Sequence, residues 1–196
     1  MKNNTLQYYE NNSEMYFNNT VDLDISNLYE GFTTKLRLND KILDLGCGSG
    51  RDSLYFKKKG FNITAIDGSE NLAKYASKLI GKEVIVSKFE ELNLIERFNG
   101  VWACASLLHM KEEDLKVLLT KIEKSLEDNG VVYMSFKYGE NDYIDDKNRY
   151  FNCYIEESIT NLIKSTTSLK VEELFKTVDV MKDREDTIWL NIILLK

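Results

Sequence analysis

A glycine-rich segment followed by an isolated aspartate is the part of this sequence best suited to do chemistry. Residues 44–50 read Asp-Leu-Gly-Cys-Gly-Ser-Gly, and Asp67 follows further along the chain. Glycines let the backbone turn tightly and approach a ligand, because a Cβ atom would occupy the space that the ligand needs. A carboxylate such as Asp67 can accept hydrogen bonds from both hydroxyls of a ribose, at about 1.5–3 kcal/mol each. These residues together predict a nucleoside-binding site.

The spacing of the glycines separates the candidate cofactors. Gly46, Gly48 and Gly50 form G-x-G-x-G, whereas a dinucleotide fingerprint needs G-x-G-x-x-G. Arg51 stands where its third glycine would be. The G-x-x-x-x-G-K-[ST] pattern of a phosphate-binding loop does not occur. The glycine loop alone is weak evidence for a nucleoside-containing cofactor. Together with Asp67 and the predicted order of strands and helices, the evidence becomes strong.

His109 is the only histidine of the sequence, and it follows a predicted strand at the edge where a substrate would approach. As a general base it could take a proton from a nucleophile. The alternative is a structural role, in which His109 caps the helix that is predicted to begin at Lys111 or packs nearby. The residue type and its position do not separate these two roles.

Further polar and aromatic residues gather in two segments. The polar stretch from Lys137 to Arg149 is long enough to be a functional loop. The residues there that could bind a substrate, or simply be solvated, are Lys137, Tyr138, Glu140 and Arg149. Trp189 and Asn191 alternate on the last predicted strand. For Trp189 we expect packing in the core or on the sheet rather than contact with a substrate.

Apolar strands alternate with amphipathic helices along most of the chain, which is typical of a parallel sheet with helices on both faces. The strands are predicted at Lys41–Leu45, Phe61–Ile66, Val84–Ser87, Gly100–Cys104 and Val131–Phe136, with a closing hairpin of Val171–Val178 and Ile188–Leu195. Helices are predicted at Lys111–Glu127 and Tyr154–Thr166, and between Ser69 as its N-cap and Gly81 as its end. Asn3–Phe17 and Asp22–Leu36 are predicted to form helices over the carboxyl edge of the sheet, so that residues 1–37 would cap the site.

Length and composition bound the kind of protein. The 196 residues suffice for a single domain, residues 1–196, with one core. The formal charge of −6 leaves no strongly basic face, so we do not expect a nucleic-acid partner. The three cysteines lack the spacing of a zinc site or disulfide framework. The polar segment Met1–Asn12 does not resemble a signal peptide and no apolar run is of membrane length, so we expect a cytoplasmic protein without a membrane partner.

Three segments carry a resemblance to a known family. Lys41–Gly50 (KILDLGCGSG), Ile66–Ser69 (IDGS) and Val101–His109 (VWACASLLH) resemble class I S-adenosylmethionine-dependent methyltransferases. The nearest type is the small-molecule methyltransferases of tellurite resistance. The resemblance implies an α/β fold, a Rossmann-like three-layer sandwich. Its seven-stranded, mostly parallel sheet would have the order 3-2-1-4-5-7-6, with the last strand antiparallel.

The resemblance also implies where the cofactor, S-adenosyl-L-methionine, would lie. The backbone of Gly46, Cys47 and Gly48 would be beside the methionine part, and Asp67 would hold the ribose with Gly68 and Ser69 beside it. Phe89 and Glu90 would flank the adenine, with Cys104 and Ala105 on the fourth strand. Many relatives have an aspartate just before an apolar residue after the third strand, whereas this chain reads Ser87-Lys88-Phe89-Glu90.

Six further residues could contribute to the site or to the packing around it. Asp44 is expected to hold the glycine loop by hydrogen bonds. Cys47 is expected to be a small side chain that packs within the loop and has no chemical role. Arg51 could pair with the carboxylate of the cofactor or with Asp52. The tyrosines could form a lid over the cofactor or the packed side of the first helix; these are Tyr8, Tyr9 and Tyr16.

The function that follows is methyl transfer to a small-molecule acceptor by in-line displacement, without a metal, in a monomer or homodimer. His109 is the candidate catalytic base. One alternative is a catalytically silent S-adenosylmethionine-binding regulatory or partner subunit. A less favoured alternative is a nicotinamide-dependent oxidoreductase, which the glycine spacing opposes.

Overall fold

A mostly parallel sheet forms the centre of the protein. The computed structural model describes residues 5–181 and 184–196. The strands of the main sheet are β1 (Lys41–Leu45), β2 (Asn62–Asp67), β3 (Ile85–Val86), β4 (Phe98–Ala103), β5 (Leu126–Tyr138), β8 (Cys153–Tyr154), β9 (Lys170–Val178) and β10 (Ile188–Leu195). Their order is β3-β2-β1-β4-β5-β10-β9, and β8 pairs with β5. With the seven strands of this path numbered in chain order, the order is 3-2-1-4-5-7-6, which confirms the predicted sheet with one short strand added.

Strand direction also agrees with the sequence. β1, β2, β3, β4 and β5 pair in parallel, whereas β10 runs antiparallel to both β5 and β9. The predicted closing hairpin is therefore confirmed. Leu43, Val101 and Trp102 are fully buried, as expected for parallel strands that are covered on both faces.

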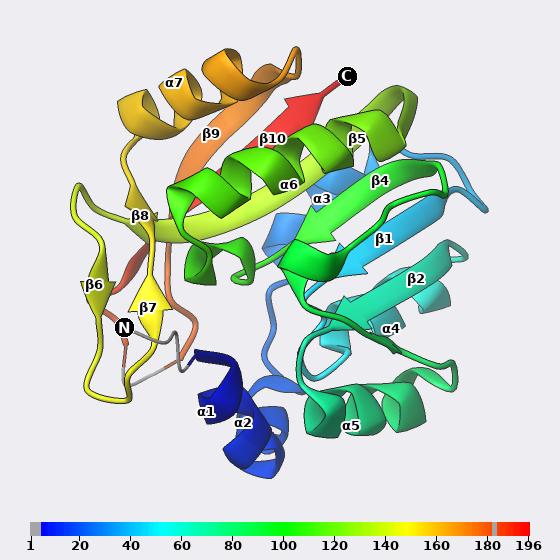
Figure 1. Cartoon of the computed structure of the whole chain (residues 1–196). Helices are drawn as coiled ribbons and strands as arrows, with labels where there is room; N and C mark the ends of the chain where they lie inside the picture. Colours follow the sequence, from blue (N-terminus) through cyan, green and yellow to red (C-terminus); the bar gives the residue numbers. More distant parts are fainter. Residues whose placement is uncertain (1–4, 182–183) are drawn as a thin grey trace.

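Helices cover the two faces of the sheet (Figure 1). The helices are α1 (Thr5–Asn11), α2 (Ser13–Thr20), α3 (Ser26–Thr33), α4 (Arg51–Lys58), α5 (Glu70–Ile80), α6 (Glu112–Ser125) and α7 (Glu156–Thr166). One apolar cluster joins α6 and α7 to Leu43 and Val101. The other joins α3, α4 and α5 to Ile42 and Trp102. Alternate residues of β1 thus belong to opposite faces, as the pleat of a strand requires.

The predicted helix ends of α5 are confirmed. The hydroxyl of Ser69 accepts a hydrogen bond from the backbone N–H of Leu72 at 3.1 Å, which satisfies one of the free donors of the first turn. Gly81 closes the helix in a left-handed conformation. This cap fixes the start of α5 directly after β2, where the candidate nucleoside site was predicted.

The N-terminal segment differs from the prediction in two respects. The helix expected at Asn3–Phe17 is two short helices, α1 and α2; residues 3 and 4 lie outside the described residues. The helix expected at Asp22–Leu36 is α3, and it packs on a face of the sheet rather than over its carboxyl edge. Phe32 contacts Trp102 and Phe56. The reason is the apolar stripe of Leu28, Tyr29 and Phe32, which is buried.

Only α1 and α2 therefore lie over the carboxyl edge, although Ile25 and Leu28 reach the cavity described below. The polar stretch between Lys137 and Arg149 contains part of a small hairpin, β6 (Tyr143–Ile144) and β7 (Tyr150–Phe151). Within the described residues, none of the helices combines the length and the apolar character needed to cross a membrane.

The packing of α3 on the sheet gives a first prediction. Phe32 is fully buried, so Phe32→Ala should lower the free energy of unfolding by about 3–5 kcal/mol through lost contacts and a cavity. Urea denaturation followed by circular dichroism measures this change. Ile95→Ala is the control, because Ile95 is 81% exposed and should change the free energy by less than about 0.5 kcal/mol. Similar losses in both variants would contradict the assigned packing.

Candidate functional site

The glycine loop after β1 comes very close to its neighbours. Gly46 and Gly48 have φ angles of +75° and +55°, a region that side chains other than glycine rarely adopt. A Cβ atom at Gly46 would lie 2.5 Å from the Cβ of Ser106, and one at Gly48 would lie 3.2 Å from the ring of Tyr16. The loop therefore needs glycine both for its turn and for close contact.

Asp67 connects this loop to the start of α5. The backbone N–H of Gly48 donates to Oδ2 of Asp67 at 2.8 Å, and the N–H of Ser69 donates to Oδ1 at 2.9 Å. Burial raises the pKa of Asp67, and the same two N–H groups oppose the shift. An ionised carboxylate offers about four acceptor positions, so each oxygen of Asp67 keeps capacity for a further donor such as a ribose hydroxyl.

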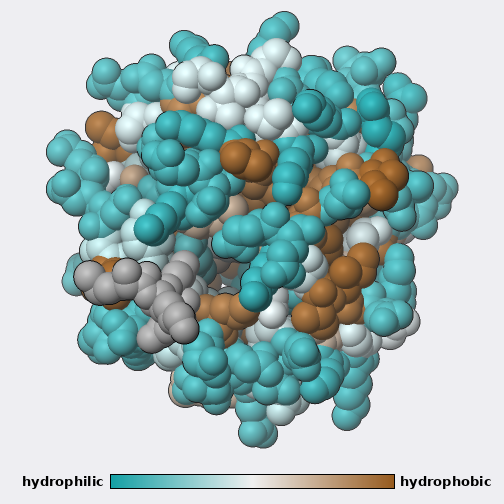
Figure 2. Space-filling view, in the orientation of Figure 1, coloured by the Kyte–Doolittle hydropathy of each residue, from teal (hydrophilic) through white to brown (hydrophobic). Residues whose placement is uncertain are grey.

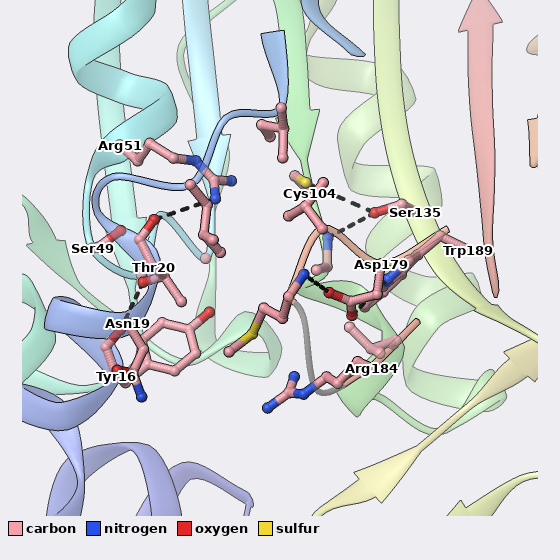
Figure 3. Close-up of a pocket in the computed structure, with 18 of the residues that line it drawn as sticks. Tyr16, Asn19, Thr20, Ser49, Arg51, Cys104, Ser135, Asp179, Arg184 and Trp189 are labelled. Atoms are coloured by element: carbon pink, nitrogen blue, oxygen red, sulfur yellow. Dashed lines mark hydrogen bonds between the residues drawn. The ribbon is translucent and has the colours of Figure 1, made fainter. Parts of the chain in front are cut away.

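A cavity of about 280 Å³ adjoins the loop at the carboxyl ends of the strands. Its wall is formed by the glycine loop, α2, the ends of β4 and β5, and residues of β9 and β10 (Figure 3). The space-filling view in Figure 2 shows that the molecule is hollowed near the centre of one face. The sequence-predicted residues on the wall are Gly46, Cys47, Gly48, Arg51, Cys104, Ala105, Tyr16 and His109.

The other predicted cofactor residues do not line this cavity: Asp44, Asp67, Gly68, Ser69, Phe89 and Glu90. Helix α1 covers the region around Asp67, which is 8% exposed. Leu6 lies 3.0 Å from where a Cβ of Gly68 would be, and the Ser69 hydroxyl donates to Glu10 at 2.6 Å. The predicted ribose position is thus adjacent to the cavity but covered by the N-terminal helices.

Asp44 and Glu90 have different surroundings. Asp44 is 1% exposed and accepts a hydrogen bond from the Ser53 hydroxyl at 2.6 Å, which places it behind the loop. Burial and the neighbouring Asp52 raise its pKa to about 8. Glu90 is exposed. Phe89, in contrast, lies 3.1 Å from the Cβ position of Gly46 and so contacts the glycine loop.

Ser106 was not predicted from the sequence, although it lies within the VWACASLLH segment. Among the described residues, its Oγ is the only buried side-chain oxygen or nitrogen without a hydrogen-bond partner. This oxygen lies 3.3 Å from the Cβ position of Gly46. A buried polar group without a partner costs about 1–3 kcal/mol, and a polar atom of a ligand held by the loop would satisfy it. The glycine cradle and Ser106 together fit a nucleoside cofactor.

Arg51 pairs with Asp52, so this one of its two predicted roles is realised. Its Nε donates to Oδ1 of Asp52 at 2.6 Å, while the side chain stays on the cavity wall (Figure 3). Asp52 also accepts hydrogen bonds from Tyr29 and from the indole N–H of Trp102, both at 2.8 Å. Asp52 therefore joins α3, α4 and β4 beneath the cavity, a role that its position in the sequence did not reveal.

His109 is part of a hydrogen-bonded chain rather than a cap of α6. Its Nδ1 lies 2.6 Å from the carbonyl oxygen of Tyr150. Because a carbonyl can only accept, Nδ1 carries the hydrogen. Nε2 then accepts from the hydroxyl of Tyr9 at 2.8 Å. Burial lowers the pKa of His109 to about 4 and raises that of Tyr9 to about 12, so both side chains are neutral at pH 7.

The remaining predicted residues divide between the wall and the surroundings. The three tyrosines Tyr8, Tyr9 and Tyr16 all line the cavity, which agrees with a lid. Of the polar stretch, Lys137 and Arg149 line it, whereas Tyr138 and Glu140 do not. Trp189, expected to serve packing, is on the wall with Asn191. The indole N–H of Trp189 donates to Asp179 at 3.0 Å, and its side chain packs against the apolar cluster of α6 and α7, as expected.

Comparison with known proteins finds similarity to methyltransferases. Residues 42–130 match a family described as a methyltransferase domain. The putative methyltransferase YqeM of Bacillus subtilis is 32% identical over 111 residues, a match that covers 51% of this chain and 45% of that protein. The probable S-adenosyl-L-methionine-dependent methyltransferase TehB of Haemophilus influenzae is 44% identical over 43 residues, 22% of this chain and 15% of that protein. This chain thus spans less than half the length of either relative.

A solved structure extends the likeness of the fold to nearly the whole chain. It is the 1,6-didemethyltoxoflavin-N1-methyltransferase of Burkholderia thailandensis, with bound 1,6-didemethyltoxoflavin and S-adenosylhomocysteine. Its TM-score is 0.77 at 19% identity, and the match covers 97% of this chain and 84% of that chain. The sheet with its flanking helices is a Rossmann-like fold, and the glycine loop and Asp67 lie at the carboxyl ends of its strands, where such folds bind ligands. With the match over residues 42–130, the chain is similar to S-adenosylmethionine-dependent methyltransferases.

The buried His109 gives a prediction about pH and stability. Its pKa is about 4 in the folded protein against 6.5 ordinarily, so the unfolded chain binds more protons between these values. Stability is therefore lost as the pH falls from 6.5 towards 4. Between pH 7 and pH 5 we expect His109 to lower the free energy of unfolding by about 2 kcal/mol. Urea titrations of the wild type and His109→Gln at both pH values measure the difference, and equal pH dependences would contradict the assignment.

Proposed function

We propose that the protein transfers a methyl group from S-adenosylmethionine to a small-molecule acceptor by in-line displacement. The observation that carries the proposal is the junction of Gly48 and Asp67, where a glycine loop meets a carboxylate that retains hydrogen-bonding capacity. The methyltransferase-domain match over residues 42–130 supports the same reaction class. When bound, the cofactor would supply an electrophilic methyl group and, as leaving group, a neutral thioether.

The residues at the junction would bind and orient the cofactor. The backbone of Gly46 and Gly48 lines the cavity and would lie against the methionine part. Arg51 is on the same wall and would face its carboxylate. Asp67 would take the ribose hydroxyls, which requires α1 to move away from Gly68, because Leu6 now contacts that region.

The Tyr9–His109 pair would handle a proton of the acceptor. The Tyr9 hydroxyl donates to Nε2 of His109, so the oxygen of Tyr9 can accept a hydrogen bond from the acceptor. As the methyl group transfers, the proton of the acceptor would pass to Tyr9 and that of Tyr9 to His109. A base with a pKa of about 4 is sufficient if methylation makes the acceptor strongly acidic, as it does for a hydroxyl.

The cavity favours a small acceptor. Its volume of about 280 Å³ is at the lower end for ligand pockets. Tyr8, Tyr9 and Tyr16 enclose it on the side of the N-terminal helices, so that water would be kept from the reacting atoms. These features support a small molecule rather than a nucleic acid as the methyl acceptor.

Replacement of Asp67 tests the cofactor site. Asp67→Asn removes the charge that strengthens hydrogen bonds from the ribose, and we expect a loss of about 10- to 100-fold in affinity for S-adenosylhomocysteine. Isothermal titration calorimetry measures this affinity. Glu70→Gln is the matched control, because Glu70 is exposed in the first turn of α5 and should leave the affinity unchanged. If Asp67→Asn binds as tightly as the wild type, the ribose assignment is wrong.

Replacement of Tyr9 and His109 tests the proton pathway. With an acceptor found by screening for release of S-adenosylhomocysteine, Tyr9→Phe and His109→Gln should each reduce kcat by about 10²-fold or more. Their affinity for S-adenosylhomocysteine should not change. Wild-type kcat in both variants would return these residues to a structural role. Tight cofactor binding without turnover of any acceptor would instead favour a silent binding subunit.

A further inference from the structure

The part of the cavity wall away from the glycine loop carries positive charge, in a protein whose net charge is −6. We call it the acceptor side. The basic residues on this part of the wall are Lys137, Lys147, Arg149 and Arg184. The carboxylates on the whole wall are Asp52 and Asp179, among the described residues. Asp52 is paired with Arg51 at the glycine loop, which leaves Asp179 as the acidic residue on the side of the four cations.

Three of these cations, Lys137, Lys147 and Arg184, lack a carboxylate partner among the described residues. Arg149 is paired with Asp145 through two nitrogens at 2.7 and 2.9 Å. Lys137 and Arg184, in contrast, form no salt bridge with any residue in 5–181 or 184–196. The Nζ of Lys137 donates to the Tyr143 hydroxyl at 2.7 Å, a neutral group that leaves the charge in place.

The charges act on one another. Burial, followed by Arg184 and Arg149, lowers the pKa of Lys137, and Asp179 opposes the shift. Asp179 already accepts hydrogen bonds from Trp189 at 3.0 Å and from the backbone N–H of Met181 at 2.9 Å. An added anion would relieve the repulsion between Lys137 and Arg184, because half-buried like charges interact strongly in a medium of low polarity.

Aromatic side chains lie beside this charge. Trp189 on β10 is directly opposite Lys137 on β5, and Figure 3 shows Trp189, Asp179 and Arg184 on the same side of the cavity. The Nζ of Lys137 lies 4.3 Å from the centre of the Phe151 ring. A ligand held here would thus meet cations at one end and aromatic surface along its body, which fits an organic anion better than a bare inorganic one.

The cationic end is also close to the candidate proton pathway. The ring of Phe151 is 4.8 Å from the ring of His109 and 4.3 Å from Nζ of Lys137. One aromatic ring therefore separates the charge from the base. A molecule about as long as one aromatic ring and its substituents could therefore be anchored at Lys137 and place a nucleophilic atom near Tyr9.

From this arrangement we propose that the methyl acceptor is a small organic acid whose anionic group binds between Lys137 and Arg184, with its apolar body against Trp189 and Phe151. The inference rests on the proposed methyl transfer and deepens it by naming the class of acceptor. Lys137 and Arg184 are then binding residues that fix the orientation of the acceptor, whereas the Tyr9–His109 pair receives the proton.

Three compounds of similar shape and different charge test the proposal: benzoate, benzamide and benzylamine. Each is titrated into the protein saturated with S-adenosylhomocysteine, and the indole N–H signals are followed by NMR. The chain has two tryptophans, and the fully buried Trp102 serves as the internal reference for Trp189. Benzoate should shift the Trp189 signal, and benzamide and benzylamine should bind at least tenfold more weakly.

Variants locate the anionic group. Lys137→Met and Arg184→Met should each weaken benzoate binding about tenfold, and Lys137→Arg should restore most of the affinity. Lys170→Met is the control, because Lys170 is exposed at the start of β9. Equal binding of benzamide and benzoate, no shift of Trp189 with benzoate, or unchanged benzoate affinity in both methionine variants would overturn the proposal.

Calorimetry with S-adenosylhomocysteine distinguishes failure of the proposed acceptor class from failure of the proposed methyl transfer. If S-adenosylhomocysteine does not bind, the methyltransferase assignment fails. The same benzoate titration on the free protein still tests whether the site at Lys137 and Arg184 binds anions. If S-adenosylhomocysteine binds and benzoate does not, only the acceptor class is wrong.

Discussion

The carboxylate of Asp67 is the constraint on which the arrangement of the site depends. It accepts the N–H of Gly48 and the N–H of Ser69, and so joins the loop after β1 to the beginning of α5. Charge-assisted hydrogen bonds of this kind are stronger than neutral ones. They hold the two backbone segments that a nucleoside would touch, and they leave part of the carboxylate's accepting capacity for that ligand. In the proposed function, one side chain would therefore serve both the structure and the binding of the cofactor.

The N-terminal helices lie between the Asp67 site and the part of the cavity proposed for the acceptor. Among the described residues of α1 and α2, only the polar Thr5 and Ser13 are buried, so these helices bury little apolar surface. Segments with little buried apolar surface open at low free energy. Tyr9 and Tyr16 nonetheless reach the cavity and His109. In the proposed function, this one segment would open to admit the cofactor and, when closed, would line the cavity where the acceptor binds.

Much of the fold and the centre of the site could be predicted from local sequence signals. The burial of β1 and β4 and the caps of α5 follow from apolar runs and from Ser69 and Gly81. The role of α3 could not be predicted, because its apolar stripe shows that it is buried but not where. The unpartnered Ser106 and the pairing of Tyr9 with His109 were also missed or left open. They arise from contacts between residues far apart in the chain, which no local pattern encodes.

A crystal structure of the protein with S-adenosylhomocysteine would show directly whether Asp67 holds the ribose. We expect both ribose hydroxyls to lie within hydrogen-bonding distance of the Asp67 carboxylate, with Leu6 displaced from Gly68 and the Gly48 N–H still bound to Asp67. The contrary result is a ribose bound away from Asp67 while Leu6 and Tyr16 keep their contacts with the loop. In that case the carboxylate would be a structural link alone.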